Sequence, residues 1–284
     1  MNRRQFLGLG LGVSLGLMLP SGLSLANSTE ERRNINLIRR GRRDLPHIAL
    51  TFDDCWYEDH TLAIAEAFAE RDIKVTFFPT GLAIRANIDS PTRGYENLYP
   101  RIHEMGHEFA CHSFSHPDIT GLTAHRLVWW EINSWIEALN EALGFEYQPT
   151  TFRPPFGIIT PELYDACWQT QLDVVLWTHD LGDHACSADT CQETMPIVMQ
   201  DALQNGAIIL QHTNQASAEF IERQLEMIEQ AELQPVLLSE MVHWLYNEEE
   251  VPTATPTPSV TRTPTSTPTP IPSPMPTNTP QSFG

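Results

Sequence analysis

The sequence predicts an α/β fold built on a parallel sheet. Short apolar, β-rich runs alternate with amphipathic helical patterns, and this alternation is typical of parallel sheets. Polar side chains capable of chemistry follow several runs directly, where the carboxyl ends of parallel strands share one face. The seven predicted strands are 47–52, 74–79, 107–112, 150–153, 173–178, 207–212 and 235–238.

Three segments between these strands have clear helical patterns. The longest, 123–144, ends at Gly144, and its apolar residues recur at intervals of three to five positions: Leu127, Ile132, Trp135, Leu139 and Leu143. A second helix is expected to begin after Thr160 as N-cap, with Pro161 at its first position. A third is expected to end at Gly206 as C-cap.

Residues 1–26 have the composition of an export signal. The paired arginines Arg3 and Arg4 precede a Gly-rich apolar run too short for a comfortable membrane span, and Ala26 closes a small-x-small cleavage site. The start Arg-Arg-Gln-Phe-Leu resembles a twin-arginine signal peptide. We therefore expect an exported protein, located in the periplasm, in the cell envelope or outside the cell. The alternative, an uncleaved anchor, also places the body outside the cytoplasm.

Two other segments are unlike a folded domain. Residues 27–46 form a basic connector with six arginines between positions 32 and 43, and two interpretations stay open, a solvated linker or a contact with anionic lipid or wall polymer. Residues 251–284 contain ten prolines and ten threonines and bury too little apolar surface to become ordered. We expect a disordered Thr/Pro-rich tail, either a stalk associated with the cell wall or a tail without function.

The region between these segments is strongly acidic. Residues 44–250 contain 34 acidic and 8 basic side chains, a net charge of −26. This charge would repel nucleic acid and anionic polymers. It excludes nucleic acid as a partner and favours a neutral or cationic substrate.

Five cysteines follow the predicted signal peptide, and an odd number cannot all pair within the chain. Cys186 and Cys191 are close in sequence, and oxidising surroundings would allow a disulfide there; whether it forms stays open. Cys111 and Cys167 have apolar neighbours and are expected to be buried thiols. No Cys-x-x-Cys pair exists, which argues against a cysteine-based zinc site.

The polar residues at the strand ends suggest a metal site. Side chains four positions apart share a face in a helix and in a strand, so His112 and His116 can converge in either. Two imidazoles and one carboxylate are the ligand set of many catalytic zinc sites. A divalent cation would also stabilise two adjacent aspartates at the end of a strand. The residues at the strand ends are Asp53, Asp54, His112, His116, Arg153, Asp180, Asp183 and His212.

Five motifs, in order, resemble those of the polysaccharide deacetylases, also called the NodB-homology or carbohydrate esterase family 4 enzymes. They are TFDD, HSFSHP, RPPFG, D-x-x-D and ILQH, and the similarity extends over about residues 47–245. The resemblance implies a single distorted (β/α)7 barrel and a catalytic domain over residues 47–247. It also implies hydrolysis of acetyl groups on a polysaccharide.

The resemblance assigns roles to the residues that match the motifs. Asp54, His112 and His116 would bind a divalent metal, most often Zn²⁺. Asp53 would be the general base that takes a proton from water. His212 would be the general acid that protonates the leaving amine.

Four further residues would complete the catalytic site. Arg153 would orient the base and Asp183 the acid. The backbone N–H of Phe156 would help to stabilise the oxyanion, and Leu210 would line the pocket for the acetyl methyl group.

The sequence departs from the family pattern at two positions near these motifs. Cys55-Trp56 replaces a common Gly-Pro pair, and His184 replaces a tryptophan. Neither change removes a ligand, the base or the acid, so we expect both to affect substrate preference.

The predicted function is N-deacetylation of a polysaccharide that contains N-acetylglucosamine, such as peptidoglycan or chitin oligomers. Three alternatives stay open: an O-acetyl esterase on a polysaccharide such as acetylxylan, a metal-dependent hydrolase of a small amide, and a catalytically silent wall-binding module. We expect a monomer whose partner is the polysaccharide. The sequence does not distinguish the polysaccharide or the native metal.

Overall fold

The computed structural model describes residues 34–247. The predicted signal peptide, residues 27–33 of the predicted connector and the predicted tail lie outside the described residues. Every strand ladder between residues 34 and 247 is parallel, as the alternation of strands and helices predicted.

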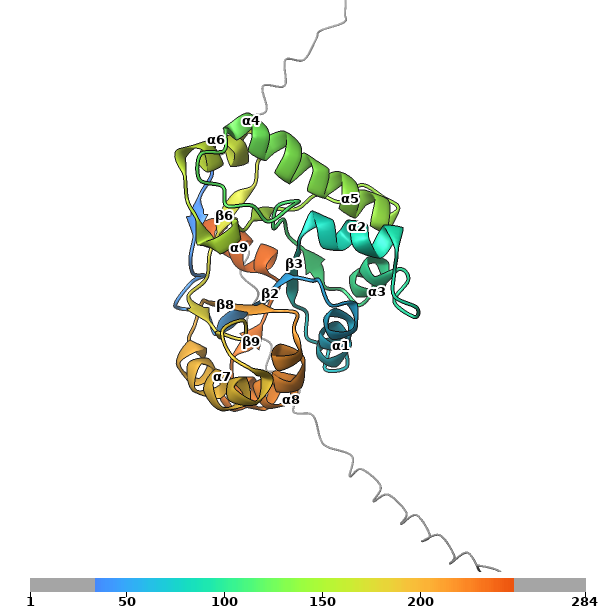
Figure 1. The fold of residues 1–284 in the computed structure, drawn as a ribbon. Helices are drawn as coiled ribbons and strands as arrows, with labels where there is room; N and C mark the ends of the chain where they lie inside the picture. Colours follow the sequence, from blue (N-terminus) through green and yellow to red (C-terminus); the bar gives the residue numbers. More distant parts are fainter. Residues whose placement is uncertain (1–33, 248–284) are drawn as a thin grey trace, which may run out of the picture.

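Strand β2 (His47–Asp54) lies at the centre of the larger sheet. It pairs with β3 (Thr76–Pro79) on one side and β8 (Ala207–His212) on the other. β4 (Glu108–Phe109) extends the sheet beyond β3, β7 (His179–Asp180) extends it beyond β8, and β9 (Gln234–Pro235) pairs with the start of β2. In Figure 1 these strands occupy the middle of the molecule, with α1, α5, α7 and α8 around them.

A smaller sheet has the order β1 (Leu37–Ile38), β6 (Asp173–Val175), β5 (Thr151–Phe152). An isolated bridge between Cys111 and Phe152 joins it to the chain that follows β4. On the other side, the N–H of Thr178, just after β6, donates to the carbonyl of Ile208 in β8. The two sheets thus continue into each other, and the predicted (β/α)7 barrel, distorted by its short strands, is confirmed.

Most of the described helices connect successive strands and lie around the barrel (Figure 1). The exception is α9, which follows the last strand and packs against buried residues of β1, β2, β6 and β8. Two of them depart from α geometry: a π-helix at Leu127–Asn133 and a short 3-10 helix at Pro155–Gly157. The α-helices are α1 (Glu58–Ala69), α2 (Gly81–Asp89), α3 (Leu98–Glu104), α4 (Ala124–Arg126), α5 (Ser134–Leu143), α6 (Pro161–Thr170), α7 (Ala188–Ala202), α8 (Gln215–Gln230) and α9 (Leu238–Tyr246).

Two of the three predicted helix ends are confirmed. The Thr160 hydroxyl caps α6 by accepting from the N–H of Leu163 at 3.1 Å, and Gly144 ends α5 with φ 77°. The predicted end at Gly206 is wrong, because α7 stops at Ala202. Gly206 instead lies where two chain segments meet: a Cβ atom there would be 2.6 Å from the carbonyl oxygen of Gly41. Only glycine permits that approach.

The folded domain begins earlier than the predicted boundary at residue 47. Within the predicted connector, Leu37 and Ile38 pair with Val174 and Val175 of β6, and Ile38 is buried. Arg40 also donates to the carbonyl of Asn205 at 3.2 Å. This strand was not predicted from the sequence, because arginines surround the apolar dipeptide. The described part of the connector is therefore part of the barrel.

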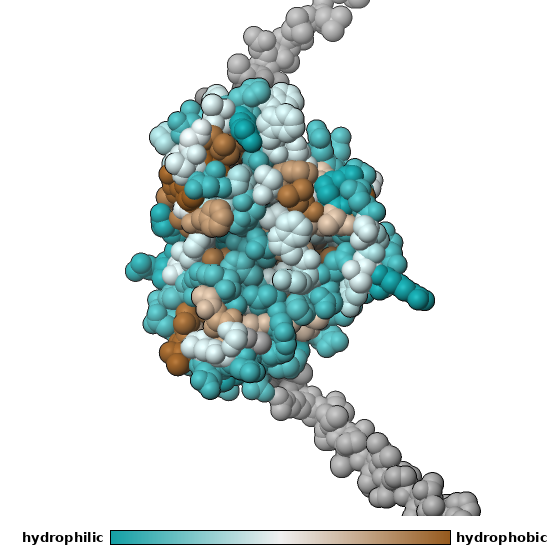
Figure 2. All heavy atoms as spheres, in the orientation of Figure 1, coloured by the Kyte–Doolittle hydropathy of each residue, from teal (hydrophilic) through white to brown (hydrophobic). Residues whose placement is uncertain are grey.

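The buried apolar residues form two clusters, a larger one of strand and helix residues and a smaller one that includes α9. Phe52 on β2 packs against Phe77 on β3 with ring centroids 5.6 Å apart. The face in Figure 2 is largely hydrophilic, with apolar residues in small separate groups. None of the helices between residues 34 and 247 has the length and apolar character needed to cross a membrane.

Candidate active site

Strand β2 ends in two aspartates whose side chains point in different directions. Successive residues of a strand alternate between its two faces, and the backbone then turns sharply because Asp54 and Cys55 both have left-handed conformations, with φ 72° and 60°. The Asp53 side chain is buried, while that of Asp54 is 29% exposed. Each carboxylate therefore has its own set of partners.

Asp53 is paired with a buried arginine. Its Oδ1 accepts a hydrogen bond from Arg153 Nη1 at 2.6 Å, and the same nitrogen donates to the Thr51 hydroxyl at 2.9 Å. The Arg153 guanidinium, at the end of β5, has no exposed surface and lies 4.1 Å from the ring centroid of Phe78. Burial raises the pKa of Asp53, and the Arg153 guanidinium opposes that rise. These contacts fix the orientation predicted for the base.

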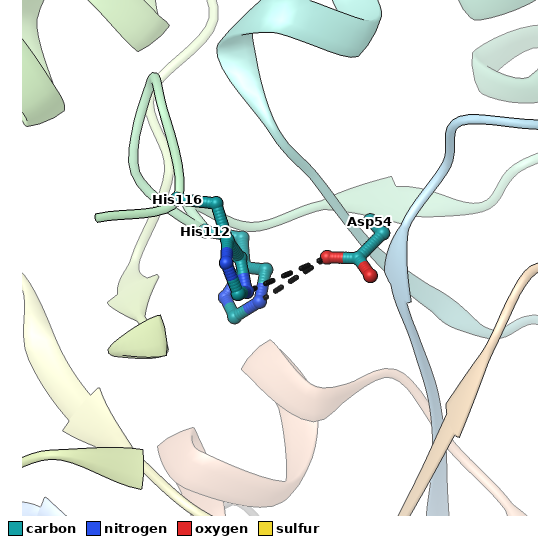
Figure 3. A group of neighbouring side chains, drawn as sticks. All are labelled: Asp54, His112 and His116. Atoms are coloured by element: carbon teal, nitrogen blue, oxygen red, sulfur yellow. Dashed lines mark ion pairs between the residues drawn. The ribbon is translucent and has the colours of Figure 1, made fainter. Parts of the chain in front are cut away.

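Asp54 faces the two histidines of the HSFSHP motif. Its Oδ1 lies 3.6 Å from His112 Nε2 and 3.7 Å from His116 Nε2. Figure 3 shows both imidazole rings directed toward this one carboxylate oxygen. The three ligand atoms lie within 4.8 Å of one another, so the residues predicted to bind a metal are brought together.

The geometry of these three residues fits a divalent cation. Bonds of about 2.1 Å in a tetrahedral arrangement separate ligand atoms by ~3.4 Å, close to the two distances from Asp54. Asp54 Oδ1 is buried and accepts no hydrogen bond from any described residue. His112 Nδ1 lies 2.8 Å from the Arg153 carbonyl, which fixes the proton on Nδ1 and leaves Nε2 as a lone-pair donor. Burial lowers the pKa of His112 to about 3, which keeps the ring neutral.

The two histidines converge through a loop, not through a helix or strand as the spacing suggested. Ser113 and His116 have left-handed backbones, with φ 63° and 53°. The Ser113 hydroxyl accepts from the N–H of His116 at 3.0 Å, which closes a tight turn. This turn places the centroids of the two imidazole rings 4.9 Å apart.

His212, at the end of β8, is held by Asp183 through two contacts. Its Nδ1 lies 2.8 Å from Asp183 Oδ1, and its backbone N–H donates to Oδ2 at 2.6 Å. Burial alone would lower the pKa of His212, but the hydrogen bond and charge of Asp183 raise it to about 9. Burial alone would raise the pKa of Asp183, and hydrogen bonds from His212 and Ser217 outweigh burial and lower it. His212 therefore retains its proton at neutral pH, as a general acid must.

The other predicted site residues lie near these groups. Phe156 has an exposed side chain and a left-handed backbone, and the centroid of its ring lies 4.7 Å from that of His116. Leu210 is buried two positions before His212 on β8, so the two side chains share a face of the strand. Asp180 lies outside this set, because its carboxylate accepts from the N–H of Gly182 and stabilises a turn.

A cavity of about 340 Å³ opens beside Asp54 and His212. Its walls add residues that the sequence analysis did not assign to the site. Trp56 and Tyr57 are about half exposed and follow the turn at Asp54. Asn214 and Gln215, at the start of α8, also line it. The replacement of Gly-Pro by Cys55-Trp56 was the one sequence feature that pointed to this wall.

A disulfide stabilises the loop on the far side of the cavity. Cys186 and Cys191 are bonded, with their Cα atoms 5.5 Å apart, which answers the question that the sequence left open. His184 lies in the same loop, 52% exposed, with its ring centroid 5.0 Å from that of His212. Asp183, His184 and His212 form a second group of possible ligands, but the Asp183 carboxylate already accepts hydrogen bonds at both oxygens.

The sequence and fold both match known proteins. A family profile described as "Polysaccharide deacetylase" matches residues 40–175. The uncharacterized protein YlxY of Bacillus subtilis is 27% identical over 191 residues, which cover 67% of this chain and 56% of YlxY.

Two solved structures share the fold. The peptidoglycan N-acetylglucosamine deacetylase Bc1960 has a TM-score of 0.61 and 25% identity, covering 73% of this chain and 92% of that one. BA3943 from Bacillus anthracis is described as a CE4 family pseudoenzyme. It has a TM-score of 0.64 and 20% identity, and the match covers 75% of this chain and 70% of BA3943. At that identity, BA3943 supports the fold alone.

The profile match spans the end of β2, the histidine loop and Arg153, which are the elements that bring the candidate site together. The order of the five motifs and the barrel agree with it. Residues 40–175 thus match the polysaccharide deacetylase family, and the barrel is similar to that of the deacetylase Bc1960.

Proposed function

We propose that this protein is a metal-dependent N-deacetylase that acts on a polysaccharide containing N-acetylglucosamine. The observation that carries the proposal is the convergence of Asp54, His112 and His116 beside two hydrogen-bonded pairs of side chains. One pair is Asp53 with Arg153, and the other is His212 with Asp183. A ligand set, a base and an acid are the groups that amide hydrolysis requires.

Each residue has a distinct part in the proposed reaction. A divalent cation bound by the three ligands, of which Zn²⁺ fits the donor set best, would polarise the acetamide carbonyl and activate water. Asp53, oriented by Arg153, takes the proton from that water. Asp53 Oδ2 lies 3.6 Å from His112 Nε2, so the base is next to the ligands. The backbone N–H of Phe156 donates to the oxygen that becomes negatively charged.

His212 completes the reaction on the leaving-group side. Departure of an amine from a tetrahedral centre requires a proton on nitrogen. The His212 side chain is one-fifth exposed and contributes to the cavity wall, so its ring can reach the substrate. Asp183 holds the ring and stabilises its protonated form. The products are acetate and a glucosamine-type amine.

The cavity supports a sugar polymer over a small amide. The rings of Trp56 and Tyr57 offer apolar faces to the C–H groups of a pyranose ring. The name of the similar protein Bc1960, a peptidoglycan N-acetylglucosamine deacetylase, is in accord with this substrate class. A silent binding module is disfavoured, because every ligand, the base and the acid are present.

The assay that tests the proposal is acetate release from chitin oligomers, peptidoglycan and acetylxylan, each with and without a chelator. We expect release from an N-acetylglucosamine polymer that stops on chelation and returns with added Zn²⁺. Release from acetylxylan alone would favour the O-acetyl esterase. Binding of a polymer without turnover by metal-loaded protein would favour the silent module.

We also propose that the protein is exported and that it is a monomer. Its Thr/Pro-rich tail would associate with the cell wall. The disulfide between Cys186 and Cys191 supports export, because such bonds persist in oxidising compartments. Cell fractionation tests the location, and size-exclusion chromatography with light scattering tests the monomer. Protein in the cytoplasmic fraction, with residues 1–26 intact, would contradict export.

A further inference from the structure

The loop between the two candidate metal-binding histidines is held by a buried carboxylate that the proposed reaction does not use. Glu131 is 4% exposed. Its carboxylate accepts from the N–H of Phe114 at 3.1 Å, the N–H of Ser115 at 2.9 Å and the Ser115 hydroxyl at 2.9 Å. Phe114 and Ser115 are two of the three residues between His112 and His116.

The opposite side of the same loop is held by the start of α2. The N–H of Gly81 donates to the Ser113 carbonyl at 3.0 Å, and the N–H of Leu82 donates to the Phe114 carbonyl at 2.8 Å. The approach is close, because a Cβ atom on Gly81 would lie 2.2 Å from the Phe114 ring. The loop is therefore fixed through its carbonyls by α2 and through its N–H groups by Glu131.

The loop needs this support because its own conformation is unfavourable. A left-handed backbone costs a non-glycine residue about 1–2 kcal/mol, and the loop contains two, Ser113 and His116. Hydrogen bonds to an ionised carboxylate are about twice as strong as those between neutral groups. Glu131 thus stabilises the turn that places His116 opposite His112.

Glu131 lies on the buried face of the π-helix. Leu127, Glu131 and Ile132 are buried there, while Trp129 and Trp130 are exposed. Departures from α geometry of this kind are frequent at functional sites.

We propose that Glu131 is a positioning residue that sets the affinity of the Asp54–His112–His116 group for its cation. Glu131 does not belong to the ligand group, and it acts through the backbone of the loop. The proposal rests on the ligand set of the proposed function.

The test compares Glu131→Gln with Glu108→Gln in the full chain. Glu108 is a matched control, because its carboxylate also accepts from a backbone N–H and a hydroxyl, those of Ser239 and Thr76, but away from the ligand loop. The Zn²⁺ dissociation constant of each variant is measured by chelator competition, without substrate. We expect a weakening of about 10- to 100-fold for Glu131→Gln, the range for partners of metal ligands. The affinity of Glu108→Gln should match that of the wild type even where its melting temperature falls.

Equal affinity in Glu131→Gln and the wild type would overturn the proposal, as would an equal loss in Glu108→Gln. If Glu131→Gln does not fold, Ser115→Ala takes its place, since it removes only the hydroxyl donor to Glu131. Ser115→Ala should weaken Zn²⁺ binding by a smaller factor, and unchanged affinity would again count against the proposal. His116→Ala separates this failure from failure of the proposed function: if it still binds one Zn²⁺ tightly, the ligand set itself is wrong.

Discussion

Asp53 and Asp54 are neighbours in sequence, yet their surroundings suit them to different tasks. Asp53 is buried against Arg153, while Asp54 presents a buried oxygen without a hydrogen-bond partner among the described residues. The turn formed by Asp54 and Cys55 in left-handed conformations separates the two carboxylates. The same pair of residues can thus supply a base and a ligand.

Replacing Asp53 by Asn should abolish most turnover and leave metal binding intact. The variant keeps the shape of the side chain and loses the charge that accepts a proton. General base catalysis is worth about 10²- to 10⁴-fold, so we expect kcat for acetate release to fall within that range. Metal analysis should still find one cation per chain, since Asp54, His112 and His116 are unchanged. A wild-type rate would show that another group is the base.

Replacing Asp183 by Asn should move the alkaline limb of the pH–rate profile to lower pH. His212 must carry a proton to act as acid, so activity falls as pH rises through its pKa. Asp183 is the main group that raises this pKa to about 9. Its loss lowers the pKa toward the ordinary value of 6.5. The kcat profile between pH 6 and 10 measures the shift, and an unchanged limb would show that His212 is not the acid.

Replacing Trp56 by Ala should weaken binding of oligomers more than that of the N-acetylglucosamine monomer. Trp56 forms part of the cavity wall beside Asp54 and is 47% exposed. Loss of its ring should raise KM for a chitin hexamer by about tenfold, which corresponds to ~1.4 kcal/mol. Trp168→Ala is the control, because Trp168 is similarly exposed on α6 and does not line the cavity. An equal rise in both variants would exclude a specific role for Trp56.

At the residue scale, the sequence predicted the groups defined by short motifs and missed those defined by loops. The ligands, the Asp53–Arg153 pair and the His212–Asp183 pair lie at or near strand ends, where the fold brings them together. Glu131 was missed because its partners, Phe114 and Ser115, lie in a left-handed turn that has no periodic pattern.

At the scale of elements, six of the seven predicted strands are present in shorter or similar form, since apolar β-rich runs identify buried parallel strands. The seventh, predicted at 235–238, shares only Pro235 with β9, because Leu238 begins α9. β1 was missed because it has only two residues and lies among arginines. β7 was missed, because the polar pair His179–Asp180 lies beyond the apolar run predicted as a strand at 173–178. The segment 123–144 was predicted as one helix because the pattern of apolar residues does not distinguish an α-turn from a π-turn.

Removal of the disulfide by Cys186→Ser with Cys191→Ser should destabilise the protein and loosen one wall of the cavity. A bond that closes so short a loop contributes about 2 kcal/mol. The effect on activity should appear in KM, since Cys186 contributes to the cavity wall, while Asp183 is also held from the start of α8 by the Asn214 amide and the Ser217 hydroxyl. Urea unfolding measures the first effect and steady-state kinetics the second. A drop in kcat with unchanged KM would place the loop in the chemical step.

At the scale of the whole molecule, the charge of the barrel acts on any polymer that approaches it. Residues 34–247 contain 31 acidic and 12 basic side chains, a net charge of −19, and two of the acidic residues, Asp54 and Asp183, line the cavity. The field repels anionic chains and attracts the amine product. The barrel is thus better suited to a neutral polymer, or to one that is already partly deacetylated, than to a highly anionic wall fragment.

This charge predicts how salt should affect each substrate. Salt shortens the Debye length, which is about 10 Å at 0.1 M, so it should relieve repulsion between the barrel and an anionic peptidoglycan fragment. We expect kcat/KM for that fragment to rise several-fold between 20 and 200 mM NaCl. With neutral chitin oligomers kcat/KM should be constant over the same range, and inhibition by the cationic product should weaken. Equal salt dependence for neutral and anionic substrates would show that salt acts on the stability or the metal site of the enzyme, and that the field of the barrel does not select the polymer.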